Sequence, residues 1–373
     1  MIGLLGACAV LVVLVESPGQ SGAIRGVGHP GRPRRAAPAE MAPLGAAGLA
    51  PHSATPASQT GLRLLSQAAV ACETVPFHGV QISTWFGSST ETASVIQVWH
   101  RSDGQILVQA SPTGTSPAES GQAGPGVLGG QDQVLSVTSP LLNLMRRNYA
   151  ITYDGRSSVD GRAALLVTVR LPGGRPAARY WIDAATKLPL RREVLVDGSR
   201  ILSEDAFLSL SVGASQLHGM PAADARPWTG QLSVGGLAAL ADRGWPLPGD
   251  TVGGLSLFQS SETPGKSGKI VELSYSDGLS VISVFVQRGV LPRSLPGWRH
   301  FVAGDGSEVY ALDPDDRSLV WSAGGFVYTM ISDAPPAVVD QAIMHLPHDS
   351  PVGFWGRMDR GFRRLASWAN PFR

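Results

Sequence analysis

The side chains that could support catalysis or bind a metal are scattered along this sequence, and none completes a recognised set. His345 and His348 lie close together, but no cysteine or carboxylate cluster accompanies them to form a metal site. The Asp-Pro-Asp-Asp segment at 313–316 lacks the alternating ligands and terminal glutamate of a calcium loop, so a turn is expected. Phosphate-binding loops, HExxH, GxSxG and paired CxxC motifs are missing. We therefore expect no catalytic residue, metal or cofactor, and a protein that is not an enzyme.

Other reactive side chains do not change this expectation. Glu204, Asp205 and Glu262 lie within or beside expected strands, where a charged side chain normally faces water. Cys8 falls in an apolar N-terminal segment, so Cys72 would be alone after export and could form no internal disulfide. Cys72 follows alanines on an expected helix, which favours a small buried side chain over a reactive thiol.

Composition favours two folded domains with tails. The chain has 373 residues, which exceeds the usual size of one domain. Hydrophobic residues make up 43%, enough for substantial cores, and 45 glycines and 28 prolines favour strands and turns over long helices. The formal net charge of +1 provides no global field that would attract nucleic acid, so we expect no nucleic-acid partner.

The N-terminal segment predicts export. Residues 2–15 are apolar and uncharged, and they suit a signal peptide (1–15) or a short membrane anchor better than a spanning helix. No basic residue precedes them, which leaves open a start further upstream. The segment 5–8 (Leu-Gly-Ala-Cys) loosely resembles a lipoprotein cleavage box, so cleaved, lipidated and retained forms all stay open. Residues 16–58 lack hydrophobic periodicity and predict a disordered tether.

Hydrophobic periodicity predicts a first domain over residues 59–212, with folded structure beginning near Gly61. A helix is expected over 62–72, and a shorter one over 140–147 with Ser139 as its cap. Asp-Gly and Gly-Gly pairs, including Asp154-Gly155 and Asp160-Gly161, predict tight turns between antiparallel strands of one curved sheet. A long loop is expected over 111–130. The expected strands cover 77–85, 94–100, 105–109, 149–153, 163–170, 178–183, 190–196 and 201–210.

A linker is expected over 213–230, followed by a second α+β domain over 231–347. Its expected helices cover 236–242 and 335–345. Its expected strands cover 255–260, 269–274, 279–288, 308–312, 318–322 and 326–331.

The remaining residues, 348–373, form a basic, aromatic and lysine-free tail. Its large side chains cannot all find a core so near the terminus, so we expect the tail to contact a membrane or an acidic partner. The candidate contact residues are Trp355, Arg357, Arg360, Phe362, Arg363, Arg364 and Trp368.

Several segments resemble the MucB/RseB family of envelope-stress sigma-factor regulators. The most distinctive is 180–193 (YWIDAATKLPLRRE), in which an aromatic strand end and an aspartate precede a Thr-x-Leu-Pro turn and a return strand. The resemblance extends over roughly residues 60–347, and its motifs are structural rather than catalytic. The other matching segments are 77–79 (FHG), 197–202 (DGSRIL), 275–279 (YSDGL), 281–286 (VISVFV) and 324–328 (GGFVY).

This resemblance implies an α+β protein whose domain at 59–212 is a half-barrel like those of LolA and LolB. Such a half-barrel is a curved antiparallel sheet with covering helices, and a smaller C-terminal α+β domain follows it. The resemblance also implies a negative regulator of sigma-factor signalling, located in the periplasm or at the extracytoplasmic face of the cell membrane. The implied partner is the extracytoplasmic part of a transmembrane anti-sigma factor, and a lipid or lipoprotein signal is implied to release it. A periplasmic or cell-surface lipid or lipoprotein carrier is the alternative, although carriers usually need only the first domain.

A half-barrel with apolar inward positions leaves a trough that lipid chains can fill. Trp85, Trp99 and Trp181 are the candidates to line this trough. The alternative for each of them is a place in the ordinary core.

Overall fold

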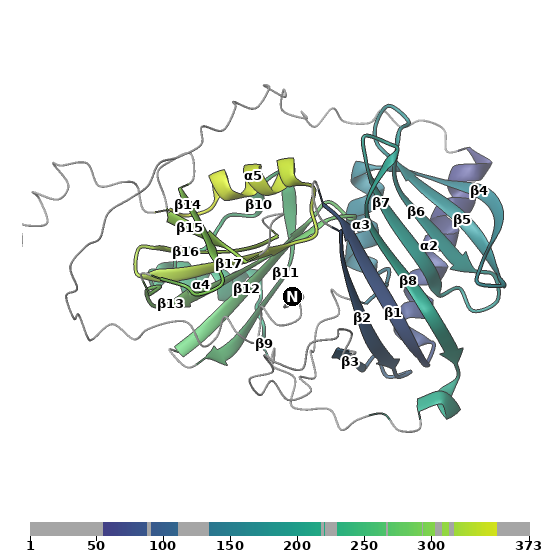
Figure 1. Ribbon diagram of the computed structural model, residues 1–373, viewed down its shortest axis with the longest axis horizontal. Helices are drawn as coiled ribbons and strands as arrows, with labels where there is room; N and C mark the ends of the chain where they lie inside the picture. The colour runs from purple at the N-terminus through teal and green to yellow at the C-terminus, as the bar shows by residue number, and fades with distance from the viewer. Residues whose placement is uncertain are drawn as a thin grey trace, which may run out of the picture.

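The structure, a computed structural model, describes residues 55–87, 91–110, 134–217, 220, 230–265, 268–292, 294–302, 308–312 and 317–348. These residues form two antiparallel sheets that lie next to each other, each with helices packed against it (Figure 1). The expected α+β fold, with a curved sheet covered by helices and a further α+β domain, is confirmed.

The first sheet has eight strands in the order β3-β2-β1-β8-β7-β6-β5-β4. Strands β4 to β8 follow one another as a meander, and β1 pairs with β8, so the first three strands extend the same sheet. The strands are β1 (Phe77–Phe86), β2 (Glu91–His100), β3 (Ile106–Ala110), β4 (Ala150–Val159), β5 (Arg162–Arg170), β6 (Pro176–Asp183), β7 (Pro189–Val196) and β8 (Arg200–Val212).

The two Asp-Gly pairs around β4 behave differently. Asp160 and Gly161 both have positive φ, 48° and 78°, and they form the tight turn between β4 and β5 that the sequence predicted. Asp154-Gly155 was also predicted to be a turn, and this was wrong. The pairing register shifts between Tyr153 and Gly155 while β4 continues to Val159, so the pair forms a bulge inside the strand.

Two helices cover one face of this sheet. Helix α2 (Pro56–Thr74) begins earlier than the expected Gly61, because the side chain of Thr55 accepts a hydrogen bond from the Ser58 N–H and proline occupies the first turn. Helix α3 (Ser139–Asn148) has Thr138 at its N-cap. Ser139 is therefore not the cap that we predicted, and its hydroxyl donates instead to Glu73.

Helix α2 lies very close to the sheet. A Cβ atom on Gly61 would come within 2.8 Å of the Thr152 carbonyl carbon in β4, so only glycine allows this approach. The buried face of α2 carries Leu64, Leu65 and Ala68 at helical spacing, and these side chains pack on β4 to β6.

The second sheet has the strand order β10-β11-β12-β13-β17-β16-β15-β14, with β9 added beside β11. Three short strands, β9, β10 and β14, were not predicted, nor was the 3-10 helix η2 (Ala214–Leu217). The helices are α4 (Val234–Asp242) and α5 (Pro336–His345). The strands are β9 (Gly230–Gln231), β10 (Thr251–Val252), β11 (Leu255–Gly265), β12 (Gly268–Ser276), β13 (Val281–Arg288), β14 (Arg299–Val302), β15 (Glu308–Ala311), β16 (Ser318–Ala323) and β17 (Phe326–Ser332).

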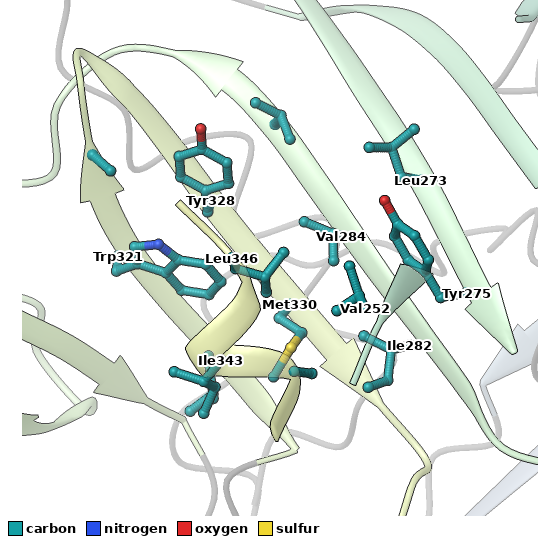
Figure 2. Close-up of a cluster of buried hydrophobic side chains, with 14 of the residues drawn as sticks. Val252, Leu273, Tyr275, Ile282, Val284, Trp321, Tyr328, Met330, Ile343 and Leu346 are labelled. Carbon is teal, nitrogen blue, oxygen red and sulfur yellow. The ribbon is translucent and has the colours of Figure 1, made fainter. Parts of the chain in front are cut away.

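The core of the second domain lies between its sheet and α5 (Figure 2). Trp321 and Tyr328 stack with ring centroids 5.4 Å apart. The polar atoms of these buried aromatic side chains have partners: the Trp321 indole donates to the Pro347 carbonyl, and the Tyr328 hydroxyl donates to the Pro246 carbonyl. Large aromatic side chains are thus buried without leaving these donors unsatisfied.

Two leucines of β8 provide a matched test of this fold. Leu202 is 2% exposed and packs on Trp85 and Val194, whereas Leu208 is 56% exposed. We expect Leu202→Ala to lower the free energy of unfolding by about 2–5 kcal/mol, because it leaves a cavity. Leu208→Ala should change it by about 0.5 kcal/mol or less. Urea unfolding followed by circular dichroism measures both, and equal effects of the two changes would contradict the structure.

Candidate functional site

The face of the first sheet that α2 and α3 cover is apolar and concave, and we call it the hollow. The side chains of α2 and α3 line the hollow on one side, and those of β4, β5 and β6 line it on the other. Most of its lining side chains are buried, and a few at its margin, such as Tyr149, are partly buried, so the hollow is filled by the protein itself. The buried side chains include Leu64, Leu65, Ala68, Ala69, Met145, Ile151, Val167, Val169, Ala178, Tyr180 and Ile182.

A turn from the second domain closes the hollow next to α3. This turn, residues 277–279, joins β12 to β13, and its Leu279 is 4% exposed and belongs to the same apolar cluster. The Tyr149 hydroxyl donates to Asp277 Oδ2 at 2.6 Å, and Asn148 Nδ2 donates to the Asp277 carbonyl at 2.9 Å. A Cβ on Gly278 would lie 2.3 Å from the Met145 nitrogen, so the turn lies directly on α3. Figure 1 shows α3 at the junction of the two domains.

The role of this turn was not predicted from the sequence, although a signal was present. A Ser-Asp-Gly-Leu hairpin places a large apolar side chain where a turn normally exposes polar residues. Burial of Leu279 against another domain satisfies that side chain.

A partly buried arginine also joins the domains. Arg192 of β7 pairs with Asp205 of β8 at 3.0 Å and approaches Asp333, which follows β17 in the second domain, at 3.8 Å. Burial raises the pKa of Asp333 to about 6, although Arg192 and the Val281 N–H act in the opposite direction. We expected Asp205 to face water, which was wrong: its side chain is only 14% exposed because it neutralises Arg192.

Trp85 is the candidate trough residue that lies on the covered face of the sheet. Trp85 shares this face with Phe77, because the two residues are an even number of positions apart along β1. Trp85 also packs on Val194. Arg317 of the second domain lies over its ring at 4.7 Å, and Arg317 Nη2 donates to Thr92 Oγ1 at 3.3 Å. The second domain therefore contacts the first sheet at Trp85 as well as at the hollow.

Trp99 and Trp181 lie on the opposite face. Trp99 pairs with His78 across β1 and β2 and stacks on its ring at 4.9 Å. Trp181 lies under Arg191 at 5.0 Å, and Arg191 pairs with Glu204. The structure thus does not bring the three tryptophans together.

The 180–193 motif builds a hairpin. Asp183 accepts hydrogen bonds from the backbone N–H groups of Ala185 and Thr186 at 2.8 Å and from Arg162. Burial alone would raise the pKa of Asp183, but these donors together hold it below its ordinary value. Lys187 takes a positive φ of 67° in the same turn. The motif is therefore structural, as its resemblance implied.

The remaining candidate groups have structural contacts or fall outside the description. His348 is partly buried on Trp321, and a ring nitrogen donates to the Ile343 carbonyl. Burial raises the pKa of the Cys72 thiol to about 11, which suppresses the reactive thiolate. No group of three or more His, Cys, Asp or Glu side chains within the described ranges could hold a metal ion. Residues 1–54, the loop at 111–130, the carboxylates at 313–316 and the tail residues 355–368 lie outside the described residues.

The comparison with protein families identifies part of the first domain. The family model of the MucB/RseB N-terminal domain matches residues 128–228. This match assigns the described residues within 128–228 to the MucB/RseB N-terminal domain family. The match includes α3, the meander β4 to β8 and the 180–193 motif, and it confirms the resemblance to the MucB/RseB family. No curated protein sequence matches the chain.

Solved structures of MucB are among those similar to this chain. MucB alone matches with 19% identity over 78% of this chain and 98% of MucB, with a TM-score of 0.46. MucB in complex with MucA(peri) matches with 19% identity over 79% of this chain and 100% of that chain, with a TM-score of 0.42. The Pseudomonas aeruginosa MucA/MucB complex gives 18% identity over 79% of this chain and 100% of that chain, with a TM-score of 0.41. The family assignment rests on the sequence match of the MucB/RseB N-terminal domain, not on these superpositions.

Asp333 makes the contact between the domains sensitive to pH. Its pKa is raised from 3.8 to about 6, so the folded protein retains a proton that the unfolded chain has lost. The stability that protonation contributes is complete below about pH 4 and is lost as pH rises through about 6. Asp333→Asn cannot ionise, so it should become increasingly stable relative to the wild type as pH rises from 4 to 7.

The stability difference between the two proteins should change by less than about 1.4 kcal/mol per pH unit, because the folded and unfolded chains differ by at most one proton at this carboxyl. The 33% exposure of the Asp333 side chain reduces the effect further. Urea unfolding of both proteins at several pH values measures it. Asp340→Asn, at an exposed position of α5, is the control and should show no such trend. A pH-independent difference for Asp333→Asn would contradict the assignment.

Proposed function

We propose that this protein is an extracytoplasmic regulator that binds the outer part of a membrane anti-sigma factor and thereby restrains sigma-factor signalling. The observation that carries this proposal is the match of residues 128–228 to the MucB/RseB N-terminal domain. The proposed partner class follows from that family, and MucB itself has a structure in complex with MucA(peri).

We infer a binding role rather than catalysis. Three charged groups at this face neutralise one another: Arg192 pairs with Asp205 and approaches Asp333 of the second domain. Their mutual neutralisation supports a function in holding the two domains together, because a general acid or base must instead be free to exchange protons with a substrate.

We propose that the hollow takes an apolar chain from a lipid or lipoprotein signal. Its aliphatic lining supports this, since an acyl chain gains its binding energy from burial of apolar surface. A carrier function is less well supported, because Leu279, Asp333 and Arg317 of the second domain all contact the first domain.

We further propose that residues 1–15 direct export or anchor the chain, and that 16–58 is a tether. The first domain would cover 59–212, a linker 213–230 and the second domain 231–347, with the 348–373 tail outside both. No helix in the part of the chain that the structure describes is long and apolar enough to cross a membrane.

Affinity capture tests the regulator. Full-length tagged protein, incubated with detergent-solubilised membranes of its own organism, should retain a single-span anti-sigma factor that mass spectrometry identifies. The same bait ending at Pro351 distinguishes capture by the folded domains from capture by the tail. Repeated capture without any single-span anti-sigma protein would argue strongly against the proposal.

The tail carries a separate prediction. Truncation at Pro351 removes Trp355, Trp368 and the neighbouring arginines, which should anchor to an anionic lipid surface by burial of aromatic rings and by charge. We expect the truncated protein to co-sediment less with anionic phospholipid vesicles than the full chain does. Unchanged partitioning would refute a role of the tail in membrane contact.

A further inference from the structure

The 277–279 turn occupies the hollow in the way that a bound ligand would. Every other buried member of the apolar cluster comes from α2, α3, strands of the first sheet or the segment before α3, and Leu279 alone comes from the second domain. The Leu279 side chain is 4% exposed and shares this cluster with Met145 of α3. The volume it fills is therefore apolar and belongs to the first domain.

The turn can leave the hollow without breaking its own structure. Asp277 Oδ1 accepts hydrogen bonds from the N–H groups of Leu279 and Ser280, both at 2.9 Å. Ser276 Oγ accepts from the Gly278 N–H at 2.8 Å and donates to the Ser280 carbonyl at 2.7 Å. These bonds lie within residues 276–280, so withdrawal of the turn leaves none of these backbone donors unsatisfied.

The turn is held in place by apolar burial of Leu279 and by polar contacts beside it. Tyr149 and Asn148 each donate one hydrogen bond to Asp277, and Arg192 approaches Asp333 at 3.8 Å. Water can replace such contacts at modest cost when the domains separate, as is usual for interfaces between domains of one chain. Removal of Leu279, in contrast, exposes apolar surface unless another apolar group takes its place.

We propose that the space filled by Leu279 is an acyl-chain site, and that the 277–279 turn and an acyl chain compete for it. An acyl chain that enters between α3 and the sheet replaces Leu279 and expels the turn, which separates the two domains. The docked turn is thus an internal competitor that lowers the apparent affinity for lipid, because only the undocked fraction can bind. This inference rests on the proposed lipid-binding function of the hollow.

Gly278→Ala tests the competition in the full-length protein. The new Cβ would lie 2.3 Å from the Met145 backbone nitrogen, so the turn can no longer dock. Gly268→Ala is the matched control. Gly268 begins β12, the strand that leads into the turn, and its φ of 114° is similar to the 103° of Gly278, but its Cβ would meet nothing within 4 Å. Both variants carry comparable backbone strain, and Gly278→Ala alone disrupts the contact between domains. Tyr149→Phe, which removes a single hydrogen bond to Asp277, provides a milder second variant.

The probe is cis-parinaric acid, a fluorescent fatty acid, which is titrated into each protein to measure its affinity. Small-angle X-ray scattering measures the radius of gyration of each protein with and without the fatty acid. We expect Gly278→Ala to bind it about tenfold more tightly than the wild type, Tyr149→Phe to lie between them, and Gly268→Ala to match the wild type. Saturating fatty acid should increase the radius of gyration of the wild type toward that of Gly278→Ala.

Two results would overturn the inference, and they differ in what they say about the proposed function. Equal, measurable affinity in all four proteins would show that a fatty acid binds without expelling the turn, so lipid binding would stand and the competition would fall. No binding by any protein, including the undocked Gly278→Ala, would remove both the acyl-chain site and lipid binding. The anti-sigma factor would still be tested by affinity capture.

Discussion

The bent sheet of the first domain has an apolar inner face that must be kept from water, and the placement of the other elements follows from this requirement. Helix α2 covers β4 to β6 so closely that Gly61 lies against the backbone of Thr152. Helix α3 covers a further part, and Leu279 of the second domain fills the remaining space. The first domain therefore completes its core with a residue that it does not itself contain, and the position of the second domain is a consequence of this shared core.

Apolar burial holds the two domains together but does not by itself fix their relative orientation. Polar contacts at two sites fix that orientation. Arg192 is mostly buried and therefore needs carboxylates nearby; Asp205 comes from its own sheet and Asp333 from the other domain. At the second site, Arg317 lies on Trp85 and bonds to Thr92. The contact of Asp333 is sensitive to pH in a way that an entirely aliphatic interface would not be. Such sensitivity suits a protein proposed to respond to a signal.

Local patterns in the sequence predicted most elements, since α2 and the strands of the meander have clear periodicity and the Asp160-Gly161 turn has the expected dipeptide. The short strands β9, β10 and β14 span too few residues to show a period. The identical dipeptide Asp154-Gly155 became a bulge because β5 continues to pair beyond it, which no local pattern records. The site was harder to predict: the face on which each tryptophan lies depends on strand register, and the burial of Asp205 and Leu279 depends on a domain that follows later in the chain.

The position of Leu279 in the chain has a consequence for biosynthesis. A chain that emerges N-terminus first, from a ribosome or across a membrane, presents α2, α3 and all eight strands of the first sheet before β12 and the turn that follows. The nascent first domain can therefore fold, but its hollow still lacks Leu279 and has an apolar opening. During that interval the emerging chain exposes apolar surface, which favours aggregation until the second half of the polypeptide arrives.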